Sequence, residues 1–526
     1  MLARETLGRW PMAAPVGARL GGVLLASLLG HGVGAAEPTW LHCPPIELCQ
    51  LRASDGGFIE HFGWAVAIEG TIAAIGEPFA RLYGCGNTVG AVYVQGYDGT
   101  QWVEQQKLVA SDGTCDSHLG YSVAMSGDLI VAGAPHVADY TGAAYVFRFD
   151  GQTWVEEAKL VPPEGAVNTG AGMAVALEGN TIAVSAPGAG AVYVYSLDGS
   201  TWLWQATLVG ENGMGGSVAL SGSVLAGSGA GGPEDPTSVV SVFRYDGAAW
   251  CLEAELTPAD GAPGDGFGVL AVCGDTILVG SPYHDHGGVN AGAAYVFTFD
   301  GQSWSQQAEL IASDAHGSDY FGCSVALADG TAVIGAYGWT GPAAWSGKTY
   351  VLTVDDLDWI ERAILTASDG RTSGWFGFAV AMSGDTVLIG APCAVGNADQ
   401  SGKAYAFAGL TSDCNANGIP DLYDIAACTS PDCNANTVPD ECDLASGTSA
   451  DADNSGRPDE CEVGDLDCDG DVDLGDINPF VMVLSDPVGW QAEYPDCYIL
   501  RADVNQDGTV NFGDINPFVA LLTGGP

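Results

Sequence analysis

Basic side chains are scarce in this sequence of 526 residues. Lysine and arginine together number 15, and only four of those residues are lysines, whereas aspartate and glutamate number 65. The formal net charge is therefore −50 at pH 7. Nucleic acids and anionic membrane surfaces attract basic patches, so this charge excludes both as natural partners and favours cations instead.

Apolar stretches long enough to span a membrane are lacking after the first 36 residues. The N-terminus carries three arginines, then a glycine-rich apolar stretch from Leu20 to Val33, then small residues at 34–36. This order is typical of a secretory signal peptide rather than a membrane anchor, because a spanning helix needs ~20 apolar residues. We expect residues 1–36 to be a cleaved signal peptide. The mature protein is then secreted, extracellular or at the cell surface, without membrane insertion.

Signatures of catalysis are missing as well. The sequence contains no Gly-x-Ser-x-Gly elbow, no phosphate-binding loop and no Cys-x-x-Cys zinc spacing. Its fifteen cysteines suit an oxidising compartment with disulfide bonds, although the sequence leaves their pairing open. These absences favour a protein that is not an enzyme.

What the sequence does contain is a repeat of about 52 residues between positions 51 and 410. Seven segments share the pattern of FGWAVAIEGTIAAIGEP, which begins at Phe62, and of FGFAVAMSGDTVLIGAP, which begins at Phe376. The copies that begin at Met214 and Phe267 are weaker. The glycine that opens each segment is Gly63, Gly120, Gly172, Gly215, Gly268, Gly322 and Gly377.

Each repeat is expected to form four short antiparallel strands. Two β-branched segments flank a tight Ser-Gly-Asp turn such as the one at 126–128, and two more flank an Asp-Gly turn such as the one at 150–151. The fold class predicted is mainly β, with a seven-bladed β-propeller over residues 37–410. The seventh unit lacks its fourth strand, so residues 37–51 are predicted to supply it and to close the ring.

Phe-Gly followed by Gly-Ala-Pro, repeated in seven units, resembles the FG-GAP repeats of integrin α-subunit propellers and of many bacterial secreted proteins. The resemblance covers about residues 39–410. Many blades of that family carry an aspartate-rich calcium loop before the Gly-Ala-Pro segment. Here that place is taken by hairpin turns such as the one at 126–128, so calcium binding is not transferred to the blades.

Repeated side chains of the propeller are expected to be structural. One tryptophan per unit is expected to pack between blades rather than on sugars, and the aspartates of Ser-Asp turns to shape turns rather than to act as acid and base. His284-Asp285-His286 is the one local irregularity that could hold a metal, but such a lone motif is more often an exposed loop cluster without function. Recognition is expected in variable loops. The tryptophans are Trp102, Trp154, Trp202, Trp250, Trp304 and Trp359, the aspartates are Asp55, Asp112, Asp314 and Asp369, and the loops are Pro135–Thr141, Pro282–Ala291 and Pro392–Ser401.

Residues 411–526 differ abruptly in composition, with 24 acidic residues against two arginines. Two 12-residue loops in this tail place oxygen-bearing groups at positions 1, 3, 5, 7, 9 and 12, with position 7 acting through its carbonyl and glycine at position 6. An EF-hand-like loop of this kind surrounds Ca²⁺ with six to eight oxygens, so Ca²⁺ is the predicted metal. The expected ligands are Asp465, Asp467, Asp469, Asp471, Asp473 and Asp476 in the first loop, and Asp503, Asn505, Asp507, Thr509, Asn511 and Asp514 in the second.

Both loops run into nearly the same apolar segment, DINPFVMVL or DINPFVALL. Duplicated calcium loops with aspartate at position 12, each followed by one helix, resemble a dockerin type I module over residues 464–526. The resemblance implies a small helical module that binds a cohesin-like protein when Ca²⁺ is present. Positions 10 and 11 depart from that family, because they are Leu474-Gly475 and Phe512-Gly513 rather than serine or threonine.

Three shorter copies of the loop pattern occupy residues 411–463. They resemble thrombospondin type 3 calcium repeats, in which a loop-rich chain winds around bound ions and is held by disulfide bonds. A disordered acidic linker is the alternative, since without metal such a segment has too little apolar surface to fold. The expected ligands are Asp413, Asn415, Asn417, Asp421 and Asp424; Asp432, Asn434, Asn436, Asp440 and Asp443; and Asp451, Asp453, Ser455, Asp459 and Glu462.

Together these features predict a secreted calcium-binding protein that acts as a binding or scaffold module. The propeller loops are expected to bind a protein or glycan ligand, and the dockerin-like tail to dock in a calcium-dependent manner. The dockerin resemblance implies an alternative, a component of an extracellular assembly for polysaccharide catabolism. This alternative leaves open whether the chain is itself an O-glycosyl hydrolase. A purely structural cell-envelope adhesin is a third hypothesis.

Overall fold

Short apolar segments separated by glycine turns form the strands, as the repeat predicts. β6 (Ser122–Ser126) and β7 (Leu129–Ala134) pair antiparallel across a turn in which Gly127 has a φ of +58°.

The computed structural model describes residues 47–522 with gaps. The gaps are 82–87, 99–100, 114, 164–167, 211–212, 230–238, 329, 341–343, 356–357, 371, 399, 409–413, 415–420, 422–429, 431–438, 450–457, 459–462, 468–471, 473, 495–496, 498 and 506–508.

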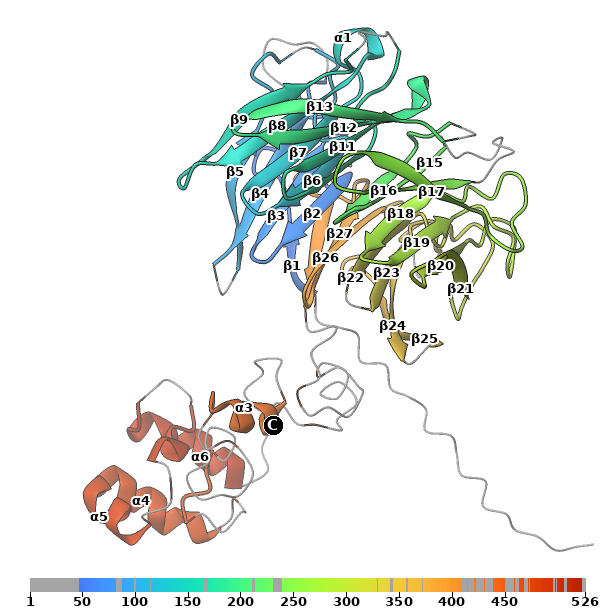
Figure 1. Ribbon diagram of the computed structural model, residues 1–526. Coiled ribbons are helices and arrows are strands. Elements are labelled where there is room, and N and C mark those ends of the chain that lie inside the picture. Colours follow the sequence, from blue (N-terminus) through green and yellow to red (C-terminus); the bar gives the residue numbers. More distant parts are fainter. Residues whose placement is uncertain are drawn as a thin grey trace, which may run out of the picture. The chain divides into compact units, whose positions relative to one another are not determined.

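The described residues contain seven four-stranded antiparallel sheets, the blades of a mainly β propeller (Figure 1). Blades 1 to 3 comprise β2 (Ala65–Glu69), β3 (Ile72–Glu77), β4 (Ala91–Tyr97) and β5 (Trp102–Leu108); β6, β7, β8 (Ala143–Phe149) and β9 (Trp154–Leu160); and β10 (Val175–Glu178), β11 (Thr181–Ala186), β12 (Ala191–Asp198) and β13 (Thr201–Leu208). Blades 4 and 5 comprise β14 (Val218–Ser221), β15 (Val224–Ser228), β16 (Val240–Tyr245) and β17 (Trp250–Leu256); and β18 (Val269–Cys273), β19 (Thr276–Ser281), β20 (Ala293–Phe299) and β21 (Trp304–Leu310). Blade 6 comprises β22 (Ser324–Ala328), β23 (Thr331–Ala336), β24 (Lys348–Asp355) and β25 (Asp358–Leu365), and blade 7 combines β26 (Ala379–Ser383), β27 (Thr386–Ala391) and β28 (Lys403–Phe407) with β1 (Glu47–Leu51).

Strand β1 closes the ring. It pairs antiparallel with β28, with Leu51 opposite Ala404, and is the outer strand of blade 7. At the other side of the same junction, the Phe62 N–H of blade 1 donates to the Ser401 carbonyl of blade 7 at 2.8 Å. The N-terminal strand therefore completes the last blade, as the missing fourth strand of the seventh repeat predicts.

Contacts between glycines determine how closely neighbouring blades approach. Gly120, which opens blade 2, has a φ of +85°, and its carbonyl oxygen would lie 2.1 Å from a Cβ built on Gly76 of blade 1. The same contact joins Gly63 to Gly390 across the closed ring, again at 2.1 Å. Two backbones can approach this closely only where no side chain stands between them. At the five junctions between blades that have this glycine pair, the glycines are thus a packing requirement.

The tryptophan of the outer strand links one blade to the next. The indole N–H of Trp202 donates to Glu157 of the preceding blade at 2.8 Å, and that of Trp304 donates to Glu253 at 2.8 Å. Each acceptor occupies a β-bulge between the third and fourth strands of its blade. The hydrophobic clusters also combine residues of two neighbouring blades, and Trp154 is buried in one of them. The expectation that these tryptophans pack between blades is confirmed.

Tyrosine and lysine hold the aspartates of the Ser-Asp turns. Lys403 and Tyr405 both donate hydrogen bonds to Asp369. Burial alone would raise the pKa of Asp369, but these two donors outweigh it and hold the pKa below its usual value. This arrangement, which we call the lysine triad, uses all four lysines of the chain. The triads are Asp55–Tyr93–Lys107, Asp112–Tyr145–Lys159, Asp314–Tyr350–Lys348 and Asp369–Tyr405–Lys403.

The described residues of the tail form short helices around a small core. α4 (Ile477–Ser485) and α6 (Ile515–Leu522) are the two copies of the duplicated apolar segment, and Phe480 stacks on Phe518 with ring centroids 4.1 Å apart. Trp490 is fully buried in the same cluster.

Within the described part of the chain, no helix has the length and apolar character needed to cross a membrane. The other helical elements are α1 (Val137–Tyr140), η1 (Pro187–Ala189), α3 (Asp440–Ser446), η3 (Leu474–Asp476), α5 (Pro487–Glu493), η4 (Ile499–Ala502) and η5 (Phe512–Asp514).

Replacing Gly76 with alanine tests the contact between blades. The new Cβ would meet the Gly120 carbonyl oxygen, so we expect G76A to lower the free energy of unfolding by about 3 kcal/mol. G127A is the matched control, because a Cβ there meets no atom within 4 Å and only the left-handed backbone opposes it, at about 1 kcal/mol. Urea denaturation followed by tryptophan fluorescence measures both losses. Equal losses in the two variants would contradict the role given to the contact.

Lys403→Met tests the lysine triad of blade 7. Because the pKa of Asp369 is lowered in the folded state, its contribution to stability is complete above the unfolded-state pKa of ~3.9 and is lost as the pH falls through the folded-state pKa. We expect K403M to lose about 1–2 kcal/mol near neutral pH, and the difference from the unchanged protein to narrow below about pH 4. R52M removes an exposed cation that donates to Gln50 and should show neither effect. Urea midpoints across this pH range provide the check, and a difference that stays constant with pH would refute the assignment.

Candidate functional site

One end of the propeller carries all the loops that lead from second to third strands. The fourth strand of each blade also ends there and continues into the next blade, because neighbouring strands are antiparallel. We call this the connecting end. The three loops predicted to carry recognition follow β7, β19 and β27 and therefore lie at this end, apart from residue 399, which is outside the described residues.

A band of aromatic side chains crosses the connecting end from blade 6 through blades 7 and 1 to blade 2. Tyr320 stacks on Tyr337 with centroids 5.3 Å apart. Phe378 then contacts Tyr337 at 5.8 Å and Trp64 at 4.8 Å. Trp345 and Tyr140 are exposed, and the other rings are half-buried. The members of this aromatic band are Tyr320, Tyr337, Trp345, Trp375, Phe378, His61, Trp64, Phe79, His118, Tyr121, His136 and Tyr140.

The aromatic band breaks the symmetry of the repeat. At the position before the opening Phe-Gly pair or its equivalent, blades 6, 7, 1 and 2 have aromatic side chains, whereas blades 3 to 5 have glycine. All of these residues have positive φ, which opposes non-glycine residues by about 1–2 kcal/mol each. Aromatic residues therefore occupy four places whose backbone conformation suits glycine. They are Tyr320, Trp375, His61 and His118, against Gly170, Gly213 and Gly266.

Sequence reasoning missed this set of residues. The signal that could have found it is an aromatic side chain at a position where other copies of the repeat have glycine. Reading that signal requires the ring order of the blades, because blades 6 and 7 adjoin blades 1 and 2 only after β1 has closed the ring.

The loop of blade 2 contains a second strained segment. Ala138, Asp139 and Tyr140 all have positive φ, so the turn within α1 is left-handed. It forms one wall of a pocket of about 490 Å³ that His118 and His136 also line. The Tyr140 side chain is 56% exposed. Backbone strain of this kind concentrates at functional sites, which supports a role for this loop in binding.

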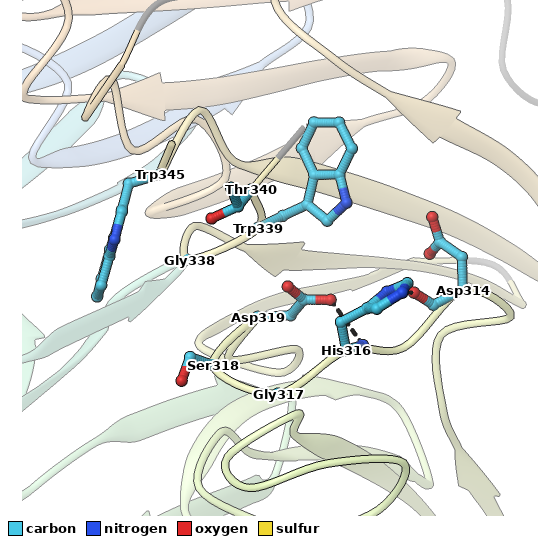
Figure 2. Close-up of a pocket in the computed structure, with 9 residues that line it drawn as sticks. All are labelled: Asp314, His316, Gly317, Ser318, Asp319, Gly338, Trp339, Thr340 and Trp345. Atoms are coloured by element: carbon cyan, nitrogen blue, oxygen red, sulfur yellow. Dashed lines mark hydrogen bonds between the residues drawn. The ribbon is translucent and has the colours of Figure 1, made fainter. Parts of the chain in front are cut away.

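A pocket of about 620 Å³ lies at the blade 6 end of the band. Figure 2 shows the indole rings of Trp339 and Trp345 apart from each other in this pocket, together with His316 and Asp319. The His316 N–H donates to the Asp319 carboxylate at 2.9 Å. Trp345 is 37% exposed and its ring centroid lies 6.1 Å from that of Tyr320. The pocket thus joins accessible aromatic faces to polar groups.

Two carboxylates of this pocket have pKa values shifted in opposite directions. Burial raises the pKa of Asp319. Burial acts on Asp314 too, but hydrogen bonds from Lys348 and Tyr350 outweigh it and lower its pKa. Such a pair can indicate acid–base chemistry. Here Asp314 belongs to a lysine triad, and Asp319 accepts a turn N–H as Asp265 does in blade 5, so repeated structural roles account for both and the arrangement favours binding.

The first predicted calcium loop brings three of its expected ligands together. Carboxylate oxygens of Asp465, Asp467 and Asp476 lie within 4.8 Å of one another. Asp476, at position 12, accepts from the N–H groups of Leu466 at 2.6 Å and Asp467 at 3.1 Å, so it is held against the start of the loop. The buried Arg501 lies 3.7 Å from Asp465 and offsets part of the negative charge. Oxygen ligands at this density suit Ca²⁺. Asp469, Asp471 and Asp473 lie outside the described residues.

Asp514 takes the corresponding place in the second loop. Its carboxylate accepts from the N–H groups of Asn505 at 3.0 Å and Asn511 at 2.9 Å. Asn511 in turn accepts from the Gly513 N–H at 2.7 Å and caps η5. Positions 3, 9 and 12 of the loop therefore converge, while Asp503 is buried and Thr509 lies beside Asn511. Asp507 is outside the described residues.

Only a few of the ligands expected between 411 and 463 lie in the described part of the chain. Asp421 accepts from the Cys414 N–H at 2.8 Å, and Asp440 and Asp443 are buried in α3. A disulfide bond joins Cys414 to Cys442 and so connects the first two copies of the loop pattern. The expected ligands outside the described residues are Asp413, Asn415, Asn417, Asp424, Asp432, Asn434, Asn436, Asp451, Asp453, Ser455, Asp459 and Glu462.

Comparison with solved structures finds chains that are similar over most of their length. A chain of the mitotic checkpoint complex is similar over 73% of this chain and 99% of its own, at 12% identity and a TM-score of 0.44. U3-55K is similar over 68% of this chain and 98% of its own, at 10% identity and a TM-score of 0.46. No curated protein matches the sequence.

The family model of the FG-GAP repeat matches the chain at six segments. These segments are 47–95, 102–147, 154–195, 250–297, 304–352 and 359–407, and together they span more than half of the chain. Each begins at the outer strand of one blade and continues through the first three strands of the next, so the first segment begins at β1. The weaker copy that begins at Met214 falls outside them. The chain therefore belongs to the FG-GAP repeat family.

Proposed function

We propose that this protein is an extracellular binding module whose propeller binds a glycan at the aromatic band of the connecting end. The observation that carries the proposal is the break in repeat symmetry. Four adjoining blades place aromatic side chains where the other three have glycine, in a backbone conformation that opposes them. Exposed rings held by a rigid scaffold are typical of a binding surface.

Charge and ring chemistry favour a neutral glycan as the ligand. The net charge of −50 repels anionic polymers. Indole and phenol faces can pack on the apolar C–H faces of sugar rings, while polar groups such as His316 and Asp319 can bind sugar hydroxyls. A protein ligand could also contact these rings, and the polysaccharide-binding experiment below distinguishes a glycan ligand from a protein ligand.

Export supports the extracellular setting. The basic, apolar and small-residue order of positions 1–36 is that of a signal peptide. Disulfide bonds, such as that between Cys414 and Cys442, persist in oxidising compartments. A neutral polysaccharide outside the cell is then accessible to the propeller.

The tail supports a second activity, calcium-dependent docking. Its duplicated loops and helices resemble a dockerin type I module, and the shorter copies before them resemble thrombospondin type 3 repeats. Equivalent apolar residues of the two copies are exposed, with Leu474 and Phe512 at 74% and 77%, and Val481 and Val519 at 57% and 51%. Paired apolar side chains of this kind provide a surface for a cohesin-like partner.

The dockerin resemblance also supports an alternative, in which the protein is a component of a polysaccharide-degrading assembly. A glycan-binding propeller joined to a docking module would bring such an assembly to its substrate. Hydrolysis of the bound polysaccharide by the purified chain would extend this alternative to an O-glycosyl hydrolase.

Alanine substitution of Trp345 and Trp375 tests glycan binding. We expect each variant to weaken binding to a neutral polysaccharide at least tenfold, about 1.4 kcal/mol, because each removes an accessible ring of the aromatic band. Affinity electrophoresis of the full chain through gels that contain members of a polysaccharide panel gives the measurement. W204A is the matched control, since Trp204 is 51% exposed but lies on the outer strand β13 of blade 3.

The outcomes separate the two ligand classes. Retardation by a neutral glycan that is lost in W345A and W375A but kept in W204A supports the proposal. Absence of retardation by every glycan, or equal loss in all three variants, would sink it and leave a protein ligand as the alternative for the same surface.

Calcium binding is tested by Asp476→Asn and Asp514→Asn. Each substitution removes one negative charge at position 12, so we expect each to weaken one Ca²⁺ site at least tenfold and the double variant to weaken two. Equilibrium dialysis of the chelator-treated full chain measures the number and affinity of sites. D486N is the control, because Asp486 caps α5 outside both loops and asparagine can replace it there. Unchanged Ca²⁺ affinity in D476N and D514N would refute the loop assignment.

A further inference from the structure

Blade 5 keeps part of the lysine triad found in blades 1, 2, 6 and 7 but lacks its lysine. Its tyrosine, Tyr295, and its turn aspartate, Asp260, correspond to those of the triads. Lysine is absent from both positions that supply it elsewhere, because the outer strand has Glu309 where blades 1 and 2 have lysine, and the third strand begins with Ala293 where blades 6 and 7 have it. The Tyr295 hydroxyl is buried and has no hydrogen-bond partner of normal geometry among the described residues. A carboxylate thus replaces the cation in this blade.

Two histidines of the loop after β19 face that carboxylate. His284 Nε2 lies 3.8 Å from Glu309 Oε1, and His286 Nδ1 lies 3.6 Å from the same oxygen. Asp260 contributes a further carboxylate oxygen 3.8 Å from His284 Nε2. One nitrogen from each histidine and one Glu309 oxygen all lie within 4.8 Å of one another. The intervening Asp285 points elsewhere, since it accepts from the Asn290 N–H at 2.8 Å within the loop.

These separations fit a small, four-coordinate metal ion. Ligands bound to Zn²⁺ at about 2.0–2.2 Å in a tetrahedron lie about 3.3–3.6 Å from one another. The nitrogen–oxygen distances of 3.6 and 3.8 Å are only slightly longer, so small side-chain movements would close the site. The Asp260 carboxylate lies 3.8 Å from His284 Nε2 but outside the group of three, so it can serve as the fourth ligand only after it moves toward His286 and Glu309.

The outer environment of His284 is also that of a metal ligand. Its other ring nitrogen, Nδ1, lies 3.0 Å from Asp265 Oδ2, and Asp265 is buried. Metal-bound histidines commonly donate their second ring N–H to a carboxylate, which fixes the tautomer and directs the free nitrogen at the metal. Here that interaction leaves Nε2 directed at Glu309 and Asp260. His284 is itself only 13% exposed, so its orientation is held by packing.

We propose that His284, His286 and Glu309, with Asp260 as fourth ligand, bind one Zn²⁺ ion at the connecting end of blade 5. Two imidazole nitrogens favour Zn²⁺ over Ca²⁺, which prefers an all-oxygen site. The ion replaces the ammonium group that the lysine triads of other blades supply. It joins the connector before β18, the loop after β19 and the outer strand β21, and so fixes the recognition loop Pro282–Ala291.

Zinc titration of the tag-free full chain tests the site. The buffer contains excess Ca²⁺ so that the oxygen-rich loops of the tail are saturated, and isothermal titration calorimetry gives the stoichiometry and affinity. We expect one Zn²⁺ per chain, at least tenfold weaker binding in H286A, and loss of this site in E309K. E309K installs the lysine that blades 1 and 2 have at this position, so it is expected to remain folded, which the thermal midpoint without Zn²⁺ checks.

The matched control is H136A, because His118 and His136 also form a close histidine pair, with ring centroids 4.2 Å apart. Zinc should also raise the thermal midpoint of the unchanged chain and of H136A, but not that of E309K. Zinc binding that is lost in H136A and kept in H286A and E309K would overturn the assignment. So would a folded unchanged chain that binds no Zn²⁺ in the presence of Ca²⁺.

Discussion

The close approach of glycine backbones between neighbouring blades is the constraint on which the rest of this structure depends. At Gly120 and Gly76 a carbonyl oxygen occupies the space where a side chain would stand, and the same contact joins Gly63 to Gly390 where the ring closes. Where the blades approach in this way, Trp202, Trp250 and Trp304 of the outer strands reach the bulge of the blade before them. The lysine triads then hold the connectors between blades, and the loops of the connecting end start from fixed positions.

Much of the fold could be predicted because its information is periodic. The glycine pairs and the Asp-Gly turns recur at a regular spacing, and they predict the strands and the blades. The last unit lacks a fourth strand, and this absence predicts that the N-terminal strand closes the ring. The two 12-residue loops of the tail were recognisable for a similar reason, and calcium binding by them stays a prediction. Asp465, Asp467 and Asp476 converge in the described part of the first loop, whereas most of their companions lie outside the described residues.

The candidate sites could not be predicted in the same way, because they depend on departures from the period. Trp375 and His61 lie far apart in the sequence but in adjoining blades once the ring is closed. Likewise, His284 and His286 look like an isolated loop motif until β21 brings Glu309 beside them in place of a lysine. Both sites arise where the chain has replaced a repeated residue by one of different chemistry. The regular copies in other blades serve as the reference that makes each replacement visible.

The lysine triads lower the reactivity of the lysine amines in the folded protein. All four lysine amines of the chain are ion-paired, two of them on side chains only 3% and 6% exposed, and all four residues lie within strands. Acylating reagents, aldehyde cross-linkers and lysine-specific proteases therefore find few reactive targets on the folded propeller. Unfolding exposes every amine together, so lysine labelling reports the integrity of the ring with little background from the native surface.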